Sequence, residues 1–159
     1  MGAPDFHPQT IPVAAAGSTF LRQPIEACGK TWLVSAVNVG NPHCVTHRDD
    51  PDARDFPRIG PAFENHPVFP ARVNAEFVQV IDHRTLRMRV WERGSGETWA
   101  CGTGACAAVV AAVENGLCPM GETVRVMLRG GDLFIRYLAD GAVVLMGDAQ
   151  KIDEGDIEI

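Results

Sequence analysis

Several features that mark whole classes of protein are scarce in this sequence of 159 residues. It contains five cysteines, no Cys-x-x-Cys pair and no long hydrophobic run. The longest apolar run, residues 105–113, is far shorter than the roughly 20 residues that a membrane-spanning helix needs, so we expect no membrane contact. An odd number of scattered cysteines does not form a disulfide framework, and we expect reduced thiols.

Positive charge is also scarce. The chain has 14 Lys and Arg against 20 Asp and Glu, which gives a formal net charge of -6. Because no basic cluster is present, we expect no nucleic-acid partner. The first residues include Asp5 and lack the basic segment of a signal peptide, so we expect a cytoplasmic location. The length is sufficient for one domain with a hydrophobic core.

The periodicity of the sequence favours strands. Alternating or continuous apolar residues predict strands over 31–39, 77–81, 86–90, 124–128, 133–138 and 143–146. The last three, with a hairpin signal at Asp140-Gly141, predict an antiparallel meander. Residues 1–29, rich in Pro and Gly, are expected to be irregular. Residues 48–70 are expected to form a loop with one short helix near 57–65.

One strong helix is predicted from about residue 103 to 115, ending at Gly116, a residue type common just after a helix. Its apolar side chains fall on every face, which is typical of a buried helix. The sequence therefore predicts an α+β fold in which a curved sheet, mixed or antiparallel, wraps around one central buried helix.

The most informative residue is Cys101, which directly precedes this helix and is followed by Gly102 and Gly104. The free N–H groups and positive dipole end of a helix can lower a thiol pKa from about 8.5 to between about 3.5 and 7.5. The same groups can bind a carboxylate. A thiolate beside a carboxylate site suits proton abstraction at the adjacent carbon, worth roughly 10²–10⁴-fold in rate. The alternative is that Cys101 only packs and the glycines only shape a turn; Cys106, inside the helix, is expected to be a core residue.

Glu92 and Arg93 follow the predicted strand 86–90. The planar guanidinium of Arg93 could bind a carboxylate through two hydrogen bonds, and Glu92 could hold an ammonium group. The alternative is an ion pair at the surface.

Asn41 and His43 follow the predicted strand 31–39, where the alternative is ordinary turn chemistry. His43, Cys44 and His47 also suggest a metal site. If this segment is extended, the two histidines lie about 13 Å apart, too far to share one ion. We therefore expect no metal.

Four segments together resemble the diaminopimelate epimerase family. They read Gly-Asn-Pro-His at 40–43, Asn-Ala-Glu-Phe at 74–77, Trp-Glu-Arg-Gly at 91–94 and Glu-Thr-Trp-Ala-Cys-Gly-Thr-Gly-Ala-Cys-Ala at 97–107. Their order and spacing match the family over nearly the whole chain. The last segment alone is shared with proline racemase and phenazine-biosynthesis relatives.

The resemblance implies an isomerase that needs no cofactor and converts LL-diaminopimelate to meso-diaminopimelate, a step toward lysine and peptidoglycan. One cysteine thiolate removes the α-proton, and a second cysteine delivers a proton to the opposite face. Cys101 would be one of these two residues, with His43 and Glu92 tuning its pKa. The implied substrate contacts are Asn41, Asn74, Glu92, Arg93, Gly102 and Thr103, of which Gly102 and Thr103 bind the α-carboxylate and Glu92 lies near the ammonium group.

The sequence departs from the family in one large respect. The second cysteine of the family belongs to an N-terminal domain with a Cys-Gly-Asn-Gly segment, which does not occur here; Cys28-Gly29-Lys30 does not match it. Residues 1–147 would form the C-terminal epimerase-like domain, and 148–159 a tail strand that pairs with the missing N-terminal domain. We expect little activity from this chain alone. The alternatives are a non-catalytic folded fragment that associates as a homodimer, and a related amino-acid racemase or isomerase.

Overall fold

The computed structural model describes residues 1–149. Within this range it contains two helices and nine strands. The helices are α1 (Phe56–Glu64) and α2 (Gly102–Glu114). The strands are β1 (Gln23–Ala27), β2 (Lys30–Asn38), β3 (Pro42–His47), β4 (Asn74–Asp82), β5 (Thr85–Glu92), β6 (Gly96–Thr98), β7 (Thr123–Leu128), β8 (Gly131–Tyr137) and β9 (Val143–Met146).

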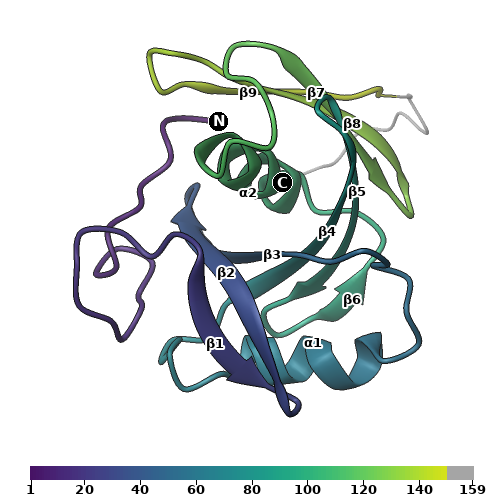
Figure 1. Ribbon diagram of the computed structural model, residues 1–159. Helices are drawn as coiled ribbons and strands as arrows, with labels where there is room; N and C mark the ends of the chain where they lie inside the picture. The colour runs from purple at the N-terminus through teal and green to yellow at the C-terminus, as the bar shows by residue number, and fades with distance from the viewer. Residues whose placement is uncertain (150–159) are drawn as a thin grey trace, which may run out of the picture.

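All nine strands belong to one sheet, in the order β1-β2-β3-β4-β5-β7-β8-β9, with β6 paired to β5 outside this path. The pairs β3–β4 and β5–β7 are parallel, and the other pairs are antiparallel. The sheet curves around α2 (Figure 1), so the predicted α+β fold with a mixed sheet around a central helix is confirmed. Within residues 1–149, neither α1 nor α2 has the length or the uninterrupted apolar sequence that a membrane span requires.

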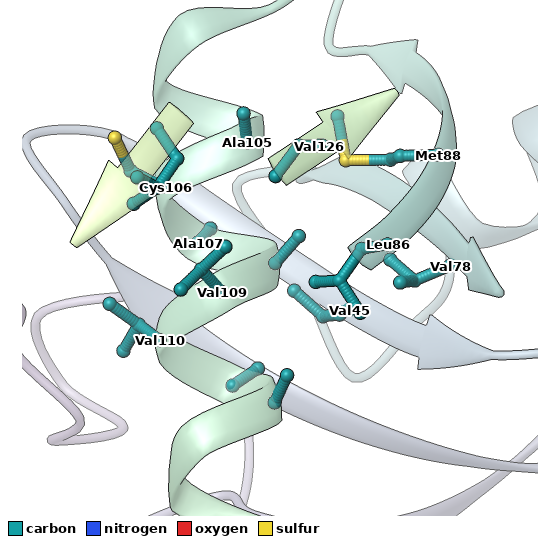
Figure 2. Packing of buried hydrophobic residues seen from close by; sticks show 14 of the residues in the cluster. Val45, Val78, Leu86, Met88, Ala105, Cys106, Ala107, Val109, Val110 and Val126 are labelled. Atoms are coloured by element: carbon teal, nitrogen blue, oxygen red, sulfur yellow. The ribbon is translucent and has the colours of Figure 1, made fainter. Parts of the chain in front are cut away.

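Helix α2 is buried on nearly all sides, as its composition predicts. Nine of its residues, from Gly104 to Ala112, are buried. Figure 2 shows Ala107 and Val109 among strand residues such as Val45, Val78 and Leu86. Gly116, after the helix, has a φ of 74°, which a residue with a side chain rarely adopts. The small alanine side chains of α2 let the curved sheet close around it.

A second core lies on the opposite face of the sheet, beneath α1 (Figure 1). It is built from aromatic rings: Phe77 contacts Trp32, Phe56 and Phe63 at centroid distances of 6.3, 5.2 and 4.9 Å. Phe77 and its neighbour Val78 point to different cores, as alternating residues of a strand do. The central strands are therefore buried on both faces, which explains their continuous apolar runs.

The prediction that residues 1–29 are irregular is wrong for β1. This strand pairs with β2 in an antiparallel hairpin. The two strands are joined by a two-residue turn, in which Cys28 and Gly29 have φ values of 53° and 74°. Two consecutive positive φ values are typical of a hairpin turn. Pro24 obscured the strand in the sequence, but proline is tolerated here because β1 is an edge strand.

Two further strands were not predicted. No strand was predicted between residues 39 and 77, but β3 begins at Pro42 and pairs with both β2 and β4. Strand β6 follows a short turn after β5 and has only three residues. The predicted antiparallel meander is confirmed as β7–β8–β9. The predicted tail strand over 148–159 lies almost entirely outside the described residues, and the domain boundary at residue 147 stays a prediction.

Candidate functional site

Cys101 occupies the position that the sequence predicts, at the head of α2. It is the N-cap residue with extended backbone angles, φ -142° and ψ 109°. Its Sγ accepts a hydrogen bond from the Gly104 N–H at 3.3 Å and lies 3.5 Å from the Thr103 hydroxyl oxygen. The residue is 8% exposed. The sulfur thus takes the place that an oxygen usually fills at a helix N-cap.

The predicted low pKa of Cys101 is wrong for this chain by itself. Burial is the largest influence and raises the pKa of the Cys101 thiol. Hydrogen bonds from Thr103 and Gly104 act in the opposite direction, whereas the negative charges of Glu76 and Glu92 raise the pKa further. Removing the thiolate from water therefore outweighs the helix N-terminus. The Cys101 side chain is a neutral thiol at pH 7 and can donate a proton.

His43 lies on β3 and is completely buried. Its Nδ1 is 2.6 Å from Glu76 Oε1, and its Nε2 is 2.8 Å from Asn41 Oδ1. Both ring nitrogens therefore have partners within the protein. Among residues 1–149, no group of three potential metal ligands gathers around it or elsewhere. Asn41, His43 and Glu76 form a connected line of polar groups inside an otherwise apolar region.

Asn74 and Arg93 are in contact, but the contact joins the Asn74 side chain to the Arg93 backbone and not to its guanidinium group. The Asn74 side chain donates to the Pro42 carbonyl at 2.9 Å and accepts from the Arg93 backbone N–H at 2.8 Å. Asn74 thus ties the start of β3 to the turn after β5. The Arg93 guanidinium is at the surface and donates to the Ala71 carbonyl at 3.2 Å, so its remaining N–H groups can bind an anion.

Glu92 accepts a hydrogen bond from the Thr98 hydroxyl across the β5–β6 hairpin. The ion pairs among the described residues do not include one between Glu92 and Arg93. The alternative interpretation of these two residues as a surface ion pair is therefore wrong for the described structure. The negative charge of Glu92 makes a small contribution that raises the pKa of Cys101.

Gly102 and Thr103 form the first turn of α2, where N–H groups have no acceptor within the helix.

Position 104 has room for glycine but not for a residue with a side chain. A Cβ atom at this position would lie 2.8 Å from Glu76 Oε1 and 3.2 Å from Cys101 Sγ. The glycine thus lets the thiol and a buried carboxyl group approach the same point on the helix.

Glu76 is the residue of this site that the sequence interpretation missed. It lies in β4, is 0% exposed, and connects His43 to the head of α2. The sequence contained an indication of this role, because Glu76 is a charged residue directly before the apolar residues 77–78 of a predicted strand. Charged residues are almost never fully buried unless they are paired.

A separate cavity of about 330 Å³ lies away from these residues. It is lined by Arg22, Trp32, His47 and Asn115, among others. Asn115 is the C-cap of α2, whereas Cys101 is its N-cap. The cavity is therefore at the other end of the helix and contributes nothing to the arrangement around Cys101.

The family model and the curated relatives that match this chain identify the same family. The family model described as diaminopimelate epimerase matches residues 35–152. The diaminopimelate epimerase of Acetivibrio thermocellus is 48% identical over 160 residues, covering 100% of this chain and 56% of that protein. The corresponding protein of Acaryochloris marina is 48% identical over 161 residues, with 99% and 56% covered. The chain thus spans about half the length of the curated relatives it matches.

Two solved structures share the fold. A hydroxyproline epimerase from Agrobacterium vitis, with bound trans-4-hydroxy-L-proline, has a TM-score of 0.61 at 14% identity, covering 90% of this chain and 45% of that chain. A probable proline racemase from Agrobacterium radiobacter has a TM-score of 0.60 at 14% identity, with 86% and 43% covered. At these identities the likeness extends to the fold alone.

Proposed function

The chain belongs to the diaminopimelate epimerase family, and from this premise we propose that it supplies one catalytic half of an enzyme that interconverts LL- and meso-diaminopimelate. The observation that carries the proposal is the placement of Cys101. Its sulfur is buried at the head of α2, beside the N–H groups of the first turn, which have no acceptor within the helix, and near a line of buried polar side chains. N–H groups at a helix N-terminus can bind a carboxylate, which supports a substrate carboxylate next to this thiol.

In the proposed reaction Cys101 begins as a neutral thiol and donates a proton to the substrate. In the reverse reaction it begins as a thiolate and removes the α-proton. A second cysteine, supplied by the remainder of the protein as a thiolate, takes the α-proton from one face of the substrate. The S–H bond of Cys101 breaks, and its proton is delivered to the α-carbon from the opposite face. The configuration is inverted, the two cysteines exchange protonation states, and no electrons are transferred. The step needs neither a metal nor a cofactor.

The first turn of α2 provides the proposed binding site for the α-carboxylate. The N–H groups of Gly102 and Thr103 and the Thr103 hydroxyl can donate to it, and the dipole of α2 favours its negative charge. Hydrogen bonds to the carboxylate also stabilise the negative charge that develops when the α-proton leaves. Asn41, Asn74 and Arg93 are proposed to bind the rest of the substrate, with Glu92 near an ammonium group.

The remainder of the protein is the proposed partner of this chain. Trp99, two residues before Cys101, is 70% exposed, although tryptophan is usually well buried. A second domain that covers Trp99 would also enclose Cys101 and bring a second thiol to the substrate. The five free cysteines favour a reducing compartment, which supports a cytoplasmic location.

The proposal predicts exchange of the substrate α-proton only when both halves are present. We define the full-length protein as this chain joined to a domain that completes the length of its relatives. In D₂O, the full-length protein is expected to incorporate deuterium at the α-carbon of diaminopimelate, and this chain alone to do so at least about 100-fold more slowly, because a catalytic pair fails when one member is missing. Nuclear magnetic resonance of the substrate measures both rates.

Two controls separate the alternatives. L-proline tests whether the chain belongs to a related racemase; preferential exchange of proline by the full-length protein would contradict the proposed substrate. Size-exclusion chromatography of the chain alone tests self-association. A full-length protein that exchanges neither substrate, together with a stable homodimer of the chain, would favour the non-catalytic alternative.

A further inference from the structure

Glu76 is a buried carboxyl group with no role in the proton transfer described above. It is 0% exposed, and one of its oxygens, Oε2, is buried without a hydrogen-bond partner among the described residues. Burying an isolated carboxylate is costly, so a buried glutamate is expected to be neutral or closely paired. The partner on the other oxygen is His43, whose Nδ1 lies 2.6 Å from Oε1.

The hydrogen bonds of His43 determine where its protons lie. Nε2 faces Asn41 Oδ1 at 2.8 Å, and an amide oxygen can only accept a hydrogen bond. Nε2 therefore carries a hydrogen. One further proton then lies between Nδ1 and Glu76 Oε1. It is bound either to Nδ1, which gives an imidazolium and a carboxylate, or to Oε1, which gives a neutral imidazole and a carboxylic acid. In both forms the Glu76–His43 pair has no net charge, which suits its complete burial.

The opposite orientation of the Asn41 amide is less favourable. It would turn the NH₂ group toward Nε2, which would then have to be unprotonated. His43 would be neutral with its hydrogen on Nδ1. Glu76 would then be either an anion with no cation beside it or a carboxylic acid protonated on Oε2, whose buried hydroxyl would have no acceptor among the described residues. Burial raises the pKa of Glu76, which opposes this anion. The neutral pair thus selects one orientation of Asn41, the one in which its NH₂ group points away from His43.

We infer that Glu76 is a positioning residue: through His43, it fixes the side-chain amide of Asn41 so that the NH₂ group faces the substrate. The inference rests on the proposed function for the presence of a substrate there. Asn41 is only partly buried and lies next to the exposed Gly40, so its NH₂ group can reach a ligand. Asn41 would therefore present the donors of its NH₂ group, which suit a carboxylate.

The neutral state of this pair also matters to the groups around it. Glu76 is faced by His43 and Cys44 from β3, by Glu92 from β5, and by Cys101 from α2. A negative charge on Glu76 would raise the pKa of the Cys101 thiol and repel Glu92. Because the shared proton leaves the pair without net charge, Glu76 raises the Cys101 pKa less than an unpaired carboxylate at this position would.

Nitrogen NMR of the full-length protein labelled with ¹⁵N-histidine tests the orientation directly. The His43 signals are identified by their loss in His43→Gln. We expect Nε2 to carry a hydrogen in the free protein at pH 7, because it faces an amide oxygen. A His43 ring that carries its hydrogen on Nδ1 alone would overturn the inference. Because no substrate is involved, this result is independent of whether diaminopimelate is the substrate.

Two substitutions of Glu76 then test its effect on binding. In Glu76→Gln, the amide NH₂ can donate to Nδ1 and preserve the line of hydrogen bonds, so KM and kcat for diaminopimelate are expected to stay within about threefold of wild type. In Glu76→Leu, Nδ1 loses its partner and Asn41 loses its fixed orientation. KM is expected to rise about tenfold or more, with a smaller change in kcat.

The pattern across these variants separates positioning from simple packing. Equal losses of kcat in Glu76→Gln and Glu76→Leu, with equal falls in thermal midpoint, would contradict the positioning role. If Glu76→Leu does not fold, the NMR of wild type and Glu76→Gln still decides, because both are expected to show the same protonated Nε2. A wild-type protein with no α-proton exchange but with this His43 signature would overturn the proposed function and leave the hydrogen-bond assignment standing.

Discussion

Replacing Cys101 with serine in the full-length protein is expected to lower kcat/KM for diaminopimelate by at least about 10²–10⁴-fold while leaving the fold intact. Serine is a favoured N-cap residue, and its hydroxyl can accept the hydrogen bond that Sγ now accepts from Gly104. A hydroxyl, however, is a much weaker acid than a thiol and cannot form the required anion near neutral pH. Steady-state kinetics and urea denaturation measure the two effects separately.

The matched control is Cys118→Ser. Cys118 is also buried, at 7% exposed, but it follows the C-terminal end of α2. This variant is expected to lose some stability and to keep kcat/KM within about threefold, because it lies at the far end of the helix from the proposed chemistry. Equal losses of activity in both variants would show that the effect of Cys101→Ser is structural and not chemical.

Replacing Phe77 with alanine is expected to lower the free energy of unfolding by about 3–5 kcal/mol. Its ring is 0% exposed and contacts three other aromatic rings, so the substitution leaves a cavity that the surrounding rings cannot fill. Phe77 also follows Glu76 directly on β4, so a shift of this strand would disturb the site. Urea denaturation followed by circular dichroism measures the loss.

Phe134→Ala is the control for this prediction, since Phe134 lies on β8 and is 41% exposed. Its loss is expected to change the free energy of unfolding by less than about 1 kcal/mol, because little apolar surface returns to water. A loss for Phe77→Ala no larger than that for Phe134→Ala would contradict the assignment of a tightly packed second core beneath α1.

The central helix and the final meander were predictable because each depends on a local pattern. The apolar run of α2 has no polar face, and the alternation around Val124 and Ile135 is typical of strands with one buried face. Strand β1 was not predictable in this way. It is short, contains Pro24, and is held by hydrogen bonds to β2 across the hairpin, which the propensity of its own residues does not contain.

The same distinction applies to the site. The position of Cys101 followed from the glycines around it, but its pKa did not, because burial by the surrounding sheet outweighs the helix N-terminus. The pairing of Glu76 with His43 joins residues 33 positions apart, through the parallel register of β3 and β4. Parallel pairing needs a crossover connection and cannot be inferred from either strand alone.

The most direct test of the central claim is whether diaminopimelate protects Cys101 from alkylation in the full-length protein. Iodoacetamide labelling at each cysteine is followed by mass spectrometry, with and without substrate. Because the pKa of Cys101 is raised, labelling is expected to be slow at pH 7 and faster toward pH 9 and above. Saturating diaminopimelate is predicted to slow the labelling of Cys101 at least about tenfold. An unchanged rate at Cys101 under saturating substrate would contradict the claim that its sulfur borders the substrate site.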